Sequence, residues 1–145
     1  MEDLVAVKLV RIAELVQRLA TRTFTPRFGL RNTDLRILNL LQGSSGMPVS
    51  ELGRRAHVDK GWISRSLAHL LSEGLVARGA HPTDTRLTLV SLTEKGRALV
   101  AEVAPIARAN EARLLAGVDG EVLKQALKQL QANAERLYEA APASD

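Results

Sequence analysis

The sequence predicts a mainly α-helical chain with one small β-hairpin. Three observations lead to this fold class. Apolar residues recur at helical spacing over most of the 145 residues. The period changes near residue 75, where short β-favouring runs flank a polar stretch rich in turn formers. Strands do not alternate with long helices along the chain, and this disfavours folds built on a parallel sheet.

The two ends of the chain are predicted to be helices with apolar seams. The first helix, roughly 3–22, and the last, roughly 120–139, repeat apolar residues at alternating spacings of four and three. A loop with Pro26 and Gly29 is expected over 23–31. Such seams are hard to bury on a small core, so we expect them to pair between two copies of the chain, although an intramolecular pair would also satisfy the pattern. The predicted dimerisation residues are Leu9, Ile12, Val16, Leu123, Leu127 and Leu130.

Three shorter helices are predicted between these ends. The first begins near Thr33, an N-cap residue type, and stops at the loop-forming run 42–46. The second covers about 50–56. After a tight break, Asp59 is expected to cap the third, roughly 60–73.

A hairpin and a long helix follow. Gly74 is placed to end the preceding helix in the left-handed conformation. Strands are expected at about 75–78 and 86–92, on either side of a polar tip. The next helix covers about 94–116, and Pro105 within it predicts a kink or a break.

Charge and composition favour a protein with a polyanionic partner and exclude functions that depend on cysteine. Seven basic residues face four acidic ones over 1–36, eight face five over 37–97, and five face seven over 98–145. The basic first two thirds favour a polyanionic partner, although ordinary surface charge would also account for them. The lack of cysteine excludes disulfides, thiolate metal sites and thiol redox sensing. Without a signal peptide or a membrane-spanning run, we expect a cytoplasmic protein with no membrane partner.

The predicted helices at 50–56 and 60–73 form a helix-turn-helix candidate. The second helix must present its N-terminal half to the major groove of duplex DNA while its apolar side packs on the other helices. That apolar side is predicted to consist of Ile63, Leu67 and Leu70. Short or basic side chains occupy the side away from the apolar residues, where an ordinary exposed face is the alternative interpretation. The predicted major-groove residues are Lys60, Gly61, Ser64 and Arg65, of which the arginine suits a bidentate contact to guanine.

The hairpin strengthens this hypothesis, because it would form the wing of a winged helix-turn-helix. Arg86 lies near its tip and is predicted to enter the minor groove, whose negative potential attracts a guanidinium. Asp84 is expected to orient Arg86 through a charge-assisted hydrogen bond, with an incidental surface ion pair as the alternative. Arg54, Arg55 and Arg78 are predicted to contact phosphates, and a solvated helix face explains the first two equally well.

One set of segments follows in order along the chain: Ile63-Ser64-Arg65-Ser66-Leu67, Leu70, Gly74-Leu75-Val76, Arg78, Pro82-x-Asp84-x-Arg86 and Val90 to Arg97. In combination, these segments resemble the MarR family of transcription regulators. The resemblance implies intertwined terminal helices in a homodimer, a major-groove helix at 60–73, and Arg86 in the minor groove. Two residues depart from the usual pattern, Trp62 in place of a small Ser or Thr and Leu71 in place of an acid. We expect Trp62 to pack against the turn before its helix or to touch the DNA backbone.

The resemblance also implies a small aromatic or phenolic acid as effector, in a pocket between the terminal helices and the winged domain. Arg11 and Arg18 would attract its carboxylate, although a solvated helix face is the simpler interpretation. No cofactor and no metal are expected, since His57, His69 and His81 occupy different elements at a spacing that is not typical of metal ligands. No catalytic motif occurs, and the chain is predicted not to be an enzyme.

The sequence thus predicts an N-terminal dimerisation helix and loop at 1–32, a winged helix-turn-helix DNA-binding domain at 33–97, and C-terminal dimerisation helices at 98–145. The predicted function is that of a ligand-responsive repressor, which binds a near-palindromic duplex-DNA operator as a homodimer. Two alternatives stay open: a non-enzymatic winged-helix adaptor that binds protein, and a non-specific architectural DNA-binding protein.

Overall fold

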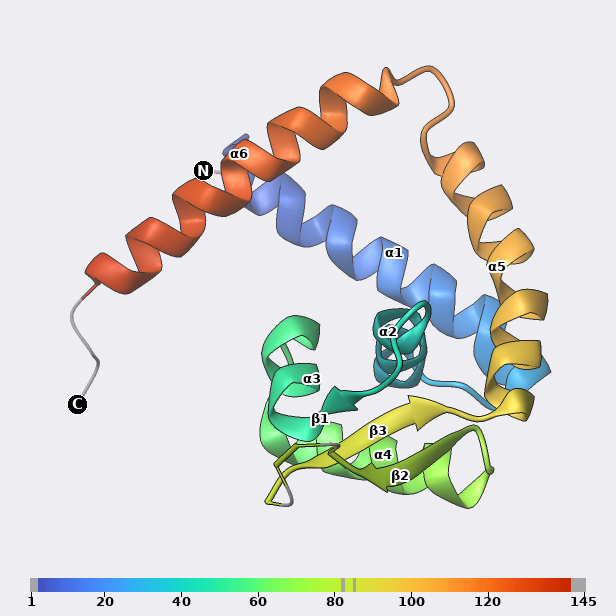
Figure 1. The fold of residues 1–145 in the computed structure, drawn as a ribbon. Coiled ribbons are helices and arrows are strands. Elements are labelled where there is room, and N and C mark those ends of the chain that lie inside the picture. The colour runs from blue at the N-terminus through green and yellow to red at the C-terminus, as the bar shows by residue number, and fades with distance from the viewer. Residues whose placement is uncertain (1–2, 82, 85, 142–145) are drawn as a thin grey trace. The chain divides into compact units, whose positions relative to one another are not determined.

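The computed structural model describes residues 3–81, 83–84 and 86–141. The predicted fold class is confirmed, since the chain is mainly helical with a small antiparallel sheet (Figure 1). The chain divides into two compact units, residues 1–104 and 105–145, which are described separately. The helices are α1 (Val5–Phe28), α2 (Asn32–Leu41), α3 (Val49–Ala56), α4 (Lys60–Ser72), α5 (Glu94–Leu114) and α6 (Gly120–Ala140), and the strands are β1 (Met47–Pro48), β2 (Val76–Ala80) and β3 (Thr88–Leu92).

Helix α1 is longer than the sequence predicts. The loop expected over 23–31 is wrong, because the helix continues through Pro26 to Phe28 and ends at Gly29 in the left-handed conformation, with φ of 69°. Burial explains the extension. The Phe24 side chain is buried, and its ring centroid lies 6.3 Å from that of Phe28. Aromatic packing of this kind outweighs the hydrogen bond that a proline removes from the last turns.

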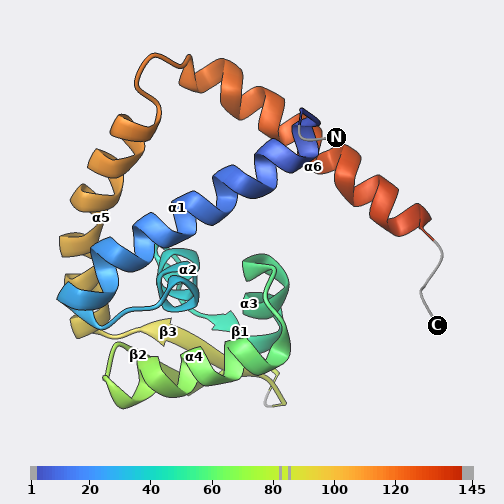
Figure 2. The ribbon, with the colours of Figure 1, turned by 180° about the vertical axis from the view of Figure 1, so that it is seen from behind.

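The core of the first unit lies among α2, α3, α4 and the sheet. Helix α4 covers one face of the hairpin formed by β2 and β3, as the view in Figure 2 shows. The apolar positions expected to pack on α4 do so, since Ile63, Leu67 and Leu70 are all buried. Their partners in the core include Ile37 and Leu41 of α2, Leu52 of α3 and Val90 of β3.

The sheet has three strands in the order β1-β3-β2, all antiparallel. The predicted hairpin is confirmed, with Val76 opposite Leu92 and Ala80 opposite Thr88. Strand β1 was not expected, because two residues are too few to show a period and one of them is Pro48. A proline is tolerated there since β1 is an edge strand.

The structure confirms two predicted ends of α4 and corrects the predicted N-cap residue of α2. Asp59 caps α4, its Oδ1 accepting the backbone N–H groups of Gly61 at 2.9 Å and Trp62 at 3.1 Å. Gly74 ends the helical turn with φ of 66°. The helix expected near Thr33 begins at Asn32, but Arg31 is its N-cap residue, so the assignment of the cap to Thr33 is wrong.

The first turn of α5 is fastened to the end of α4. Thr93 Oγ1 donates to the Gly74 carbonyl at 2.7 Å and accepts the N–H of Gly96 at 3.0 Å. A Cβ atom at Gly96 would lie 2.0 Å from the carbonyl oxygen of Leu75, so only glycine allows this approach. Further along, α5 runs without interruption through Pro105, and the predicted break is therefore wrong.

Helix α6 begins cleanly and buries nothing within its unit. Asp119 Oδ1 accepts the N–H groups of Glu121 at 3.0 Å and Val122 at 3.1 Å and so caps the helix. No residue of α6 is buried, although Leu127 and Leu130 recur on it at apolar spacing. Within the described part of the chain, every helix is too short or too polar to cross a lipid bilayer.

Candidate nucleic-acid interface

The N-terminal half of α4 presents the residues predicted to enter the major groove. Lys60, Gly61, Ser64 and Arg65 are all exposed, while the opposite side of the helix is buried in the core. The Asp59 cap satisfies two of the free N–H groups at this end. The first turn of α4 is therefore firmly ordered and carries short or basic side chains toward solvent.

Trp62 and Arg65 form a stacked pair on this face. The Arg65 Cζ atom lies 4.4 Å from the centroid of the Trp62 ring, within range of a cation–π interaction. Trp62 is exposed to 49% of its surface. Neither role expected for Trp62 from the sequence includes this contact, which places the ring beside the arginine that is best suited to reading a base.

Both candidate phosphate-binding arginines of α3 are held by one carboxylate. Glu51 accepts hydrogen bonds from Arg54 Nη2 at 2.7 Å and from Arg55 Nε at 2.5 Å. Hydrogen bonds from Arg54, and then from Arg55, lower the pKa of Glu51 to about 2. The sequence analysis missed Glu51, although its spacing of three and four residues from the two arginines on a helix is the signal for such pairs.

The wing carries the predicted orienting pair. Arg86 Nε donates to Asp84 Oδ1 at 3.1 Å and Nη2 donates to Oδ2 at 3.3 Å, so the guanidinium and the carboxylate form a bidentate pair. These bonds from Arg86 lower the pKa of Asp84. His81 Nδ1 accepts the Asp84 N–H at 3.1 Å and so braces the same loop. Arg78 is exposed on β2. Pro82, which contributes to the family resemblance, lies outside the described residues.

The buried carboxylate of Asp34 links α4 to the start of α2. Asp34 is fully buried at the start of α2, where its Oδ2 accepts from Arg31 Nε at 3.1 Å and lies 3.1 Å from His69 Nδ1. Burial raises the pKa of Asp34, but the hydrogen bonds from the Arg31 side chain and backbone outweigh it and leave the pKa below its ordinary value. Arg31 Nη2 also donates to the Arg65 carbonyl at 3.4 Å. These residues, absent from the predicted site, fix α4 on α2.

The three histidines have separate structural places. His57 ends α3 in the left-handed conformation with φ of 49°, His69 meets Asp34, and His81 braces the wing. Among the residues that the structure describes, no group of three His, Asp or Glu side chains is arranged to hold a metal ion.

A hollow lies between α3 and α4 on the side of the exposed arginines. Its volume is about 550 Å³. Apolar atoms of Val49, Val58 and Ile63 contribute to its lining together with Arg54 and Lys60. Basic side chains thus flank an apolar hollow between the two helices of the helix-turn-helix.

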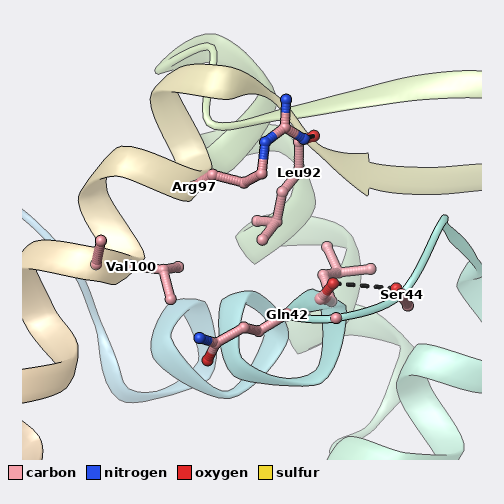
Figure 3. Close-up of a pocket in the computed structure, with 8 residues that line it drawn as sticks. Gln42, Ser44, Leu92, Arg97 and Val100 are labelled. Atoms are coloured by element: carbon pink, nitrogen blue, oxygen red, sulfur yellow. Dashed lines mark hydrogen bonds between the residues drawn. The ribbon is translucent and has the colours of Figure 1, made fainter.

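A second pocket of about 260 Å³ lies between the end of α2, the end of β3 and the start of α5 (Figure 3). Leu92 and Val100 line it along with the polar side chains of Gln42, Ser44 and Arg97. Arg97 Nη1 donates to the Leu92 carbonyl at 2.8 Å. The pocket combines apolar walls with one cationic group.

The arginines expected to attract an effector lie elsewhere, on exposed α1. Arg11 lines a surface hollow formed by α1 residues alone, and Arg18 Nη1 lies 4.0 Å from Glu14.

The predicted dimerisation residues are incompletely covered in the single chain. Ile12, Val16, Leu127 and Leu130 are exposed, and Leu9 and Leu123 are half-buried.

Comparison with known proteins identifies the family. A family model described as MarR family matches residues 28–87. The chain is 32% identical to the HTH-type transcriptional repressor Mb2911 of Mycobacterium bovis over 108 residues, which are 74% of this chain and 77% of that protein. It is 36% identical over 69 residues to the HTH-type transcriptional regulator YdgJ of Bacillus subtilis, a match that spans 48% of this chain and 42% of YdgJ.

Solved structures give the same result over nearly the whole chain. CouR from Rhodococcus jostii, bound to p-coumaroyl-CoA, superposes with a TM-score of 0.83 at 26% identity, covering 92% of this chain and 93% of CouR. The M. tuberculosis regulator MOSR, in complex with DNA, superposes with a TM-score of 0.76 at 28% identity, covering 93% of this chain and 98% of MOSR. Mb2911 and MOSR are a transcriptional repressor and a transcriptional regulator, and neither is an enzyme. The chain therefore belongs to the MarR family of DNA-binding transcriptional regulators.

Proposed function

We propose that the protein is a homodimeric repressor that binds a near-palindromic duplex-DNA operator and responds to a small acidic ligand. One observation carries this proposal. The exposed Arg65 of α4 and the Asp84-held Arg86 of the wing belong to the same compact unit, which buries the other side of α4. A helix for one groove and an arginine for the adjacent groove are the two elements that a winged helix-turn-helix requires.

Helix α4 would read the major groove. Arg65 has the fork of donors that matches O6 and N7 of guanine, and Ser64 and Lys60 lie exposed beside it. Gly61 allows the backbone of the first turn to approach the DNA closely. The structure of MOSR with DNA supports this use of the fold.

The wing and α3 would add the contacts that position the protein. Arg86, steadied by Asp84, would enter a narrow minor groove, and Arg78 would contact phosphate nearby. Arg54 and Arg55 would contact phosphate from α3. Glu51 offsets one of these two charges, so the pair would bring a net charge of about +1 to the backbone until a phosphate displaces the carboxylate.

The incompletely covered apolar residues of α1 and α6 support a homodimer. Exposed leucines and isoleucines at heptad spacing are buried most simply by a second copy of the same helices. A twofold-symmetric dimer would place two α4 helices about 34 Å apart, one turn of duplex, and its symmetry would match a near-palindromic operator.

A small aromatic or phenolic acid would act as the effector. The complex of CouR with p-coumaroyl-CoA shows a fold neighbour that binds an aromatic acid derivative. In the present chain, the pocket beside Arg97 combines a cation with apolar walls and is the site that we assign to such an acid. The ligand would release DNA only if it binds one dimer geometry more tightly than the other. Thermal unfolding with a panel of phenolic acids tests this step, and stabilisation by none of them would remove the effector from the proposal.

Selection from a pool of random duplexes tests the main proposal. We expect enrichment of a dyad-symmetric sequence by the wild-type protein. Arg65→Ala should lose about 1–3 kcal/mol at one base position in each half-site, and Arg86→Ala should lose affinity together with the preference for A·T-rich flanks. Arg108→Ala, which removes an exposed charge from α5, is the matched control.

The two alternatives give different results in the same experiment. A protein-binding adaptor would retain no duplex, and its partner binding would lack the steep salt dependence of phosphate contacts. An architectural protein would bind every duplex with similar affinity. Unchanged operator affinity in both Arg65→Ala and Arg86→Ala would show that the assigned site is wrong.

A further inference from the structure

Trp62 is the residue of this surface that the proposed function leaves without a role. It is the single tryptophan of the chain and stays 49% exposed, surrounded on α4 by small and basic side chains. A large aromatic ring that is half exposed gives up much of the stabilisation that burial would supply. Its position therefore calls for a role at the surface.

The stack with Arg65 provides that role. Residues 62 and 65 are three apart on a helix and so lie on one face, and Arg65 Cζ sits 4.4 Å from the ring centroid of Trp62. A guanidinium that stacks uses its flat face. Its N–H groups point outward in the plane and remain available for hydrogen bonds.

Arg65 differs in this respect from Arg54 and Arg86 of the same interface. Arg54 and Arg86 are held by carboxylates that occupy their donors. Across residues 3–81, 83–84 and 86–141, no acidic side chain pairs with Arg65, and its guanidinium donates to no protein acceptor. The ring of Trp62 thus restrains the guanidinium without using a donor.

The guanidinium of Arg65 also lies at the N-terminal end of α4, the end that would enter the major groove. A Cβ atom added at Gly61 would lie 3.7 Å from Arg65 Nη1 and 4.0 Å from Nη2, so the side chain folds back over the first turn of the helix. This is the end that a major groove accepts.

We propose that Trp62 is a specificity-determining residue, which holds Arg65 in one plane so that it reads a single guanine in each half of the operator. This inference rests on the proposed function. An arginine ordered before binding loses less side-chain entropy in the groove. It is also kept from neighbouring phosphates, whose contacts carry no sequence information.

The experiment uses the selected operator and a set of operators in which each base pair of a half-site is replaced in turn. Arg65→Ala first identifies the base pair that this arginine reads. We expect Trp62→Ala to lose roughly tenfold discrimination at that base pair and little at the others. Trp62→Phe keeps a ring under the guanidinium and should retain most of the discrimination. In an Arg65→Ala background, Trp62→Ala should add no further loss at that base pair.

Three results would overturn the inference. One is an equal loss of affinity by Trp62→Ala on every duplex, including random sequence, since that is the behaviour of a phosphate contact. Another is unchanged discrimination. The third comes from fluorescence: because residue 62 is the single tryptophan, Arg65→Ala must alter the emission of the free protein, and identical emission would show that the stack does not form. Thermal unfolding of each variant verifies that it is folded. If the wild type itself prefers no operator, the proposed function fails instead.

Discussion

The Nδ1 atom of His69 lies 3.1 Å from Oδ2 of Asp34, and this contact joins the DNA-facing helix α4 to a fully buried carboxylate at the start of α2. Arg31 completes the arrangement from the other side, with Nε 3.1 Å from the same oxygen. The helix expected to enter DNA is therefore oriented by charged groups as well as by its apolar side.

Replacing Asp34 with alanine should lower the free energy of unfolding by roughly 3 kcal/mol, because Arg31 and His69 would lose the carboxylate that they share in a partly buried place. Chemical denaturation measures this difference. Glu73→Ala, which removes an exposed carboxylate at the end of α4, is the control and should change stability little. Equal stability of the two variants would show that Asp34 does not hold α4 in place.

The same carboxylate should make stability depend on pH. The pKa of Asp34 is lowered in the folded state, so its ionised form stabilises the protein above the ordinary value of 3.8. This contribution is lost as the pH falls from 3.8 through the lower folded-state pKa. The stability difference between wild type and Asp34→Asn should therefore shrink as the pH falls below 3.8 and stay level above about 5.

Gly96→Ala should destabilise the first unit by about 1–3 kcal/mol, because the new Cβ would lie 2.0 Å from the Leu75 carbonyl oxygen and the backbone would have to shift. Gly53→Ala is a matched control, since its Cβ would meet Ile63 Cγ1 at an ordinary 3.8 Å and alanine favours the helix. Thermal unfolding compares the two. A Gly96→Ala protein as stable as the control would contradict the close approach of α5.

Glu51→Gln should strengthen DNA binding. The substitution removes a negative charge beside the predicted phosphate contacts and releases Arg54 and Arg55. We expect roughly threefold tighter binding at low salt, and a plot of log affinity against log salt that is steeper by about 0.9 if one more phosphate is neutralised. Fluorescence anisotropy on labelled duplex measures both, with Glu73→Gln as the control for charge. Weaker binding by Glu51→Gln would mean that Glu51 orients the arginines instead of competing with phosphate.

Introducing charge into the apolar seam of α6 should separate the subunits. The double variant Leu127→Glu/Leu130→Glu should sediment as a monomer and lose operator binding, because carboxylates at these positions oppose burial between two chains. Gln125→Glu adds one such charge to an exposed polar position of the helix and should remain a dimer. A dimeric double variant would exclude these leucines from the interface.

Local patterns predicted much of the fold correctly. The spacing of Ile63, Leu67 and Leu70 identified the buried side of α4, and Asp59 and Gly74 marked its ends, because these features depend on residues near one another in the chain. The extension of α1 past Pro26 was missed. Propensity argues against a proline inside a helix, and only the burial of Phe24 in the folded protein reverses that preference.

In the candidate site too, contacts between residues near one another in the chain could be predicted, and contacts between distant residues could not. Arg86 and Asp84 are two residues apart, and their contact could be predicted from that spacing alone. Asp34 and His69 are 35 residues apart, so no local rule connects them. The Trp62–Arg65 stack lies at helical spacing, but the choice of a ring as the partner of the guanidinium depends on which competing acids lie within reach, and this is a property of the tertiary structure.

The start of helix α5 is mechanically coupled to the end of α4. Thr93 Oγ1 donates to the Gly74 carbonyl and Lys95 Nζ donates to the Glu73 carbonyl at 2.6 Å, so two hydrogen bonds join the start of α5 to the two residues that follow α4. Within the first unit, α5 extends from Glu94 to Ala104, which is about 16 Å of helix. Because these hydrogen bonds join its start to the end of α4, a tilt of this stretch would be transmitted to the helix that faces DNA.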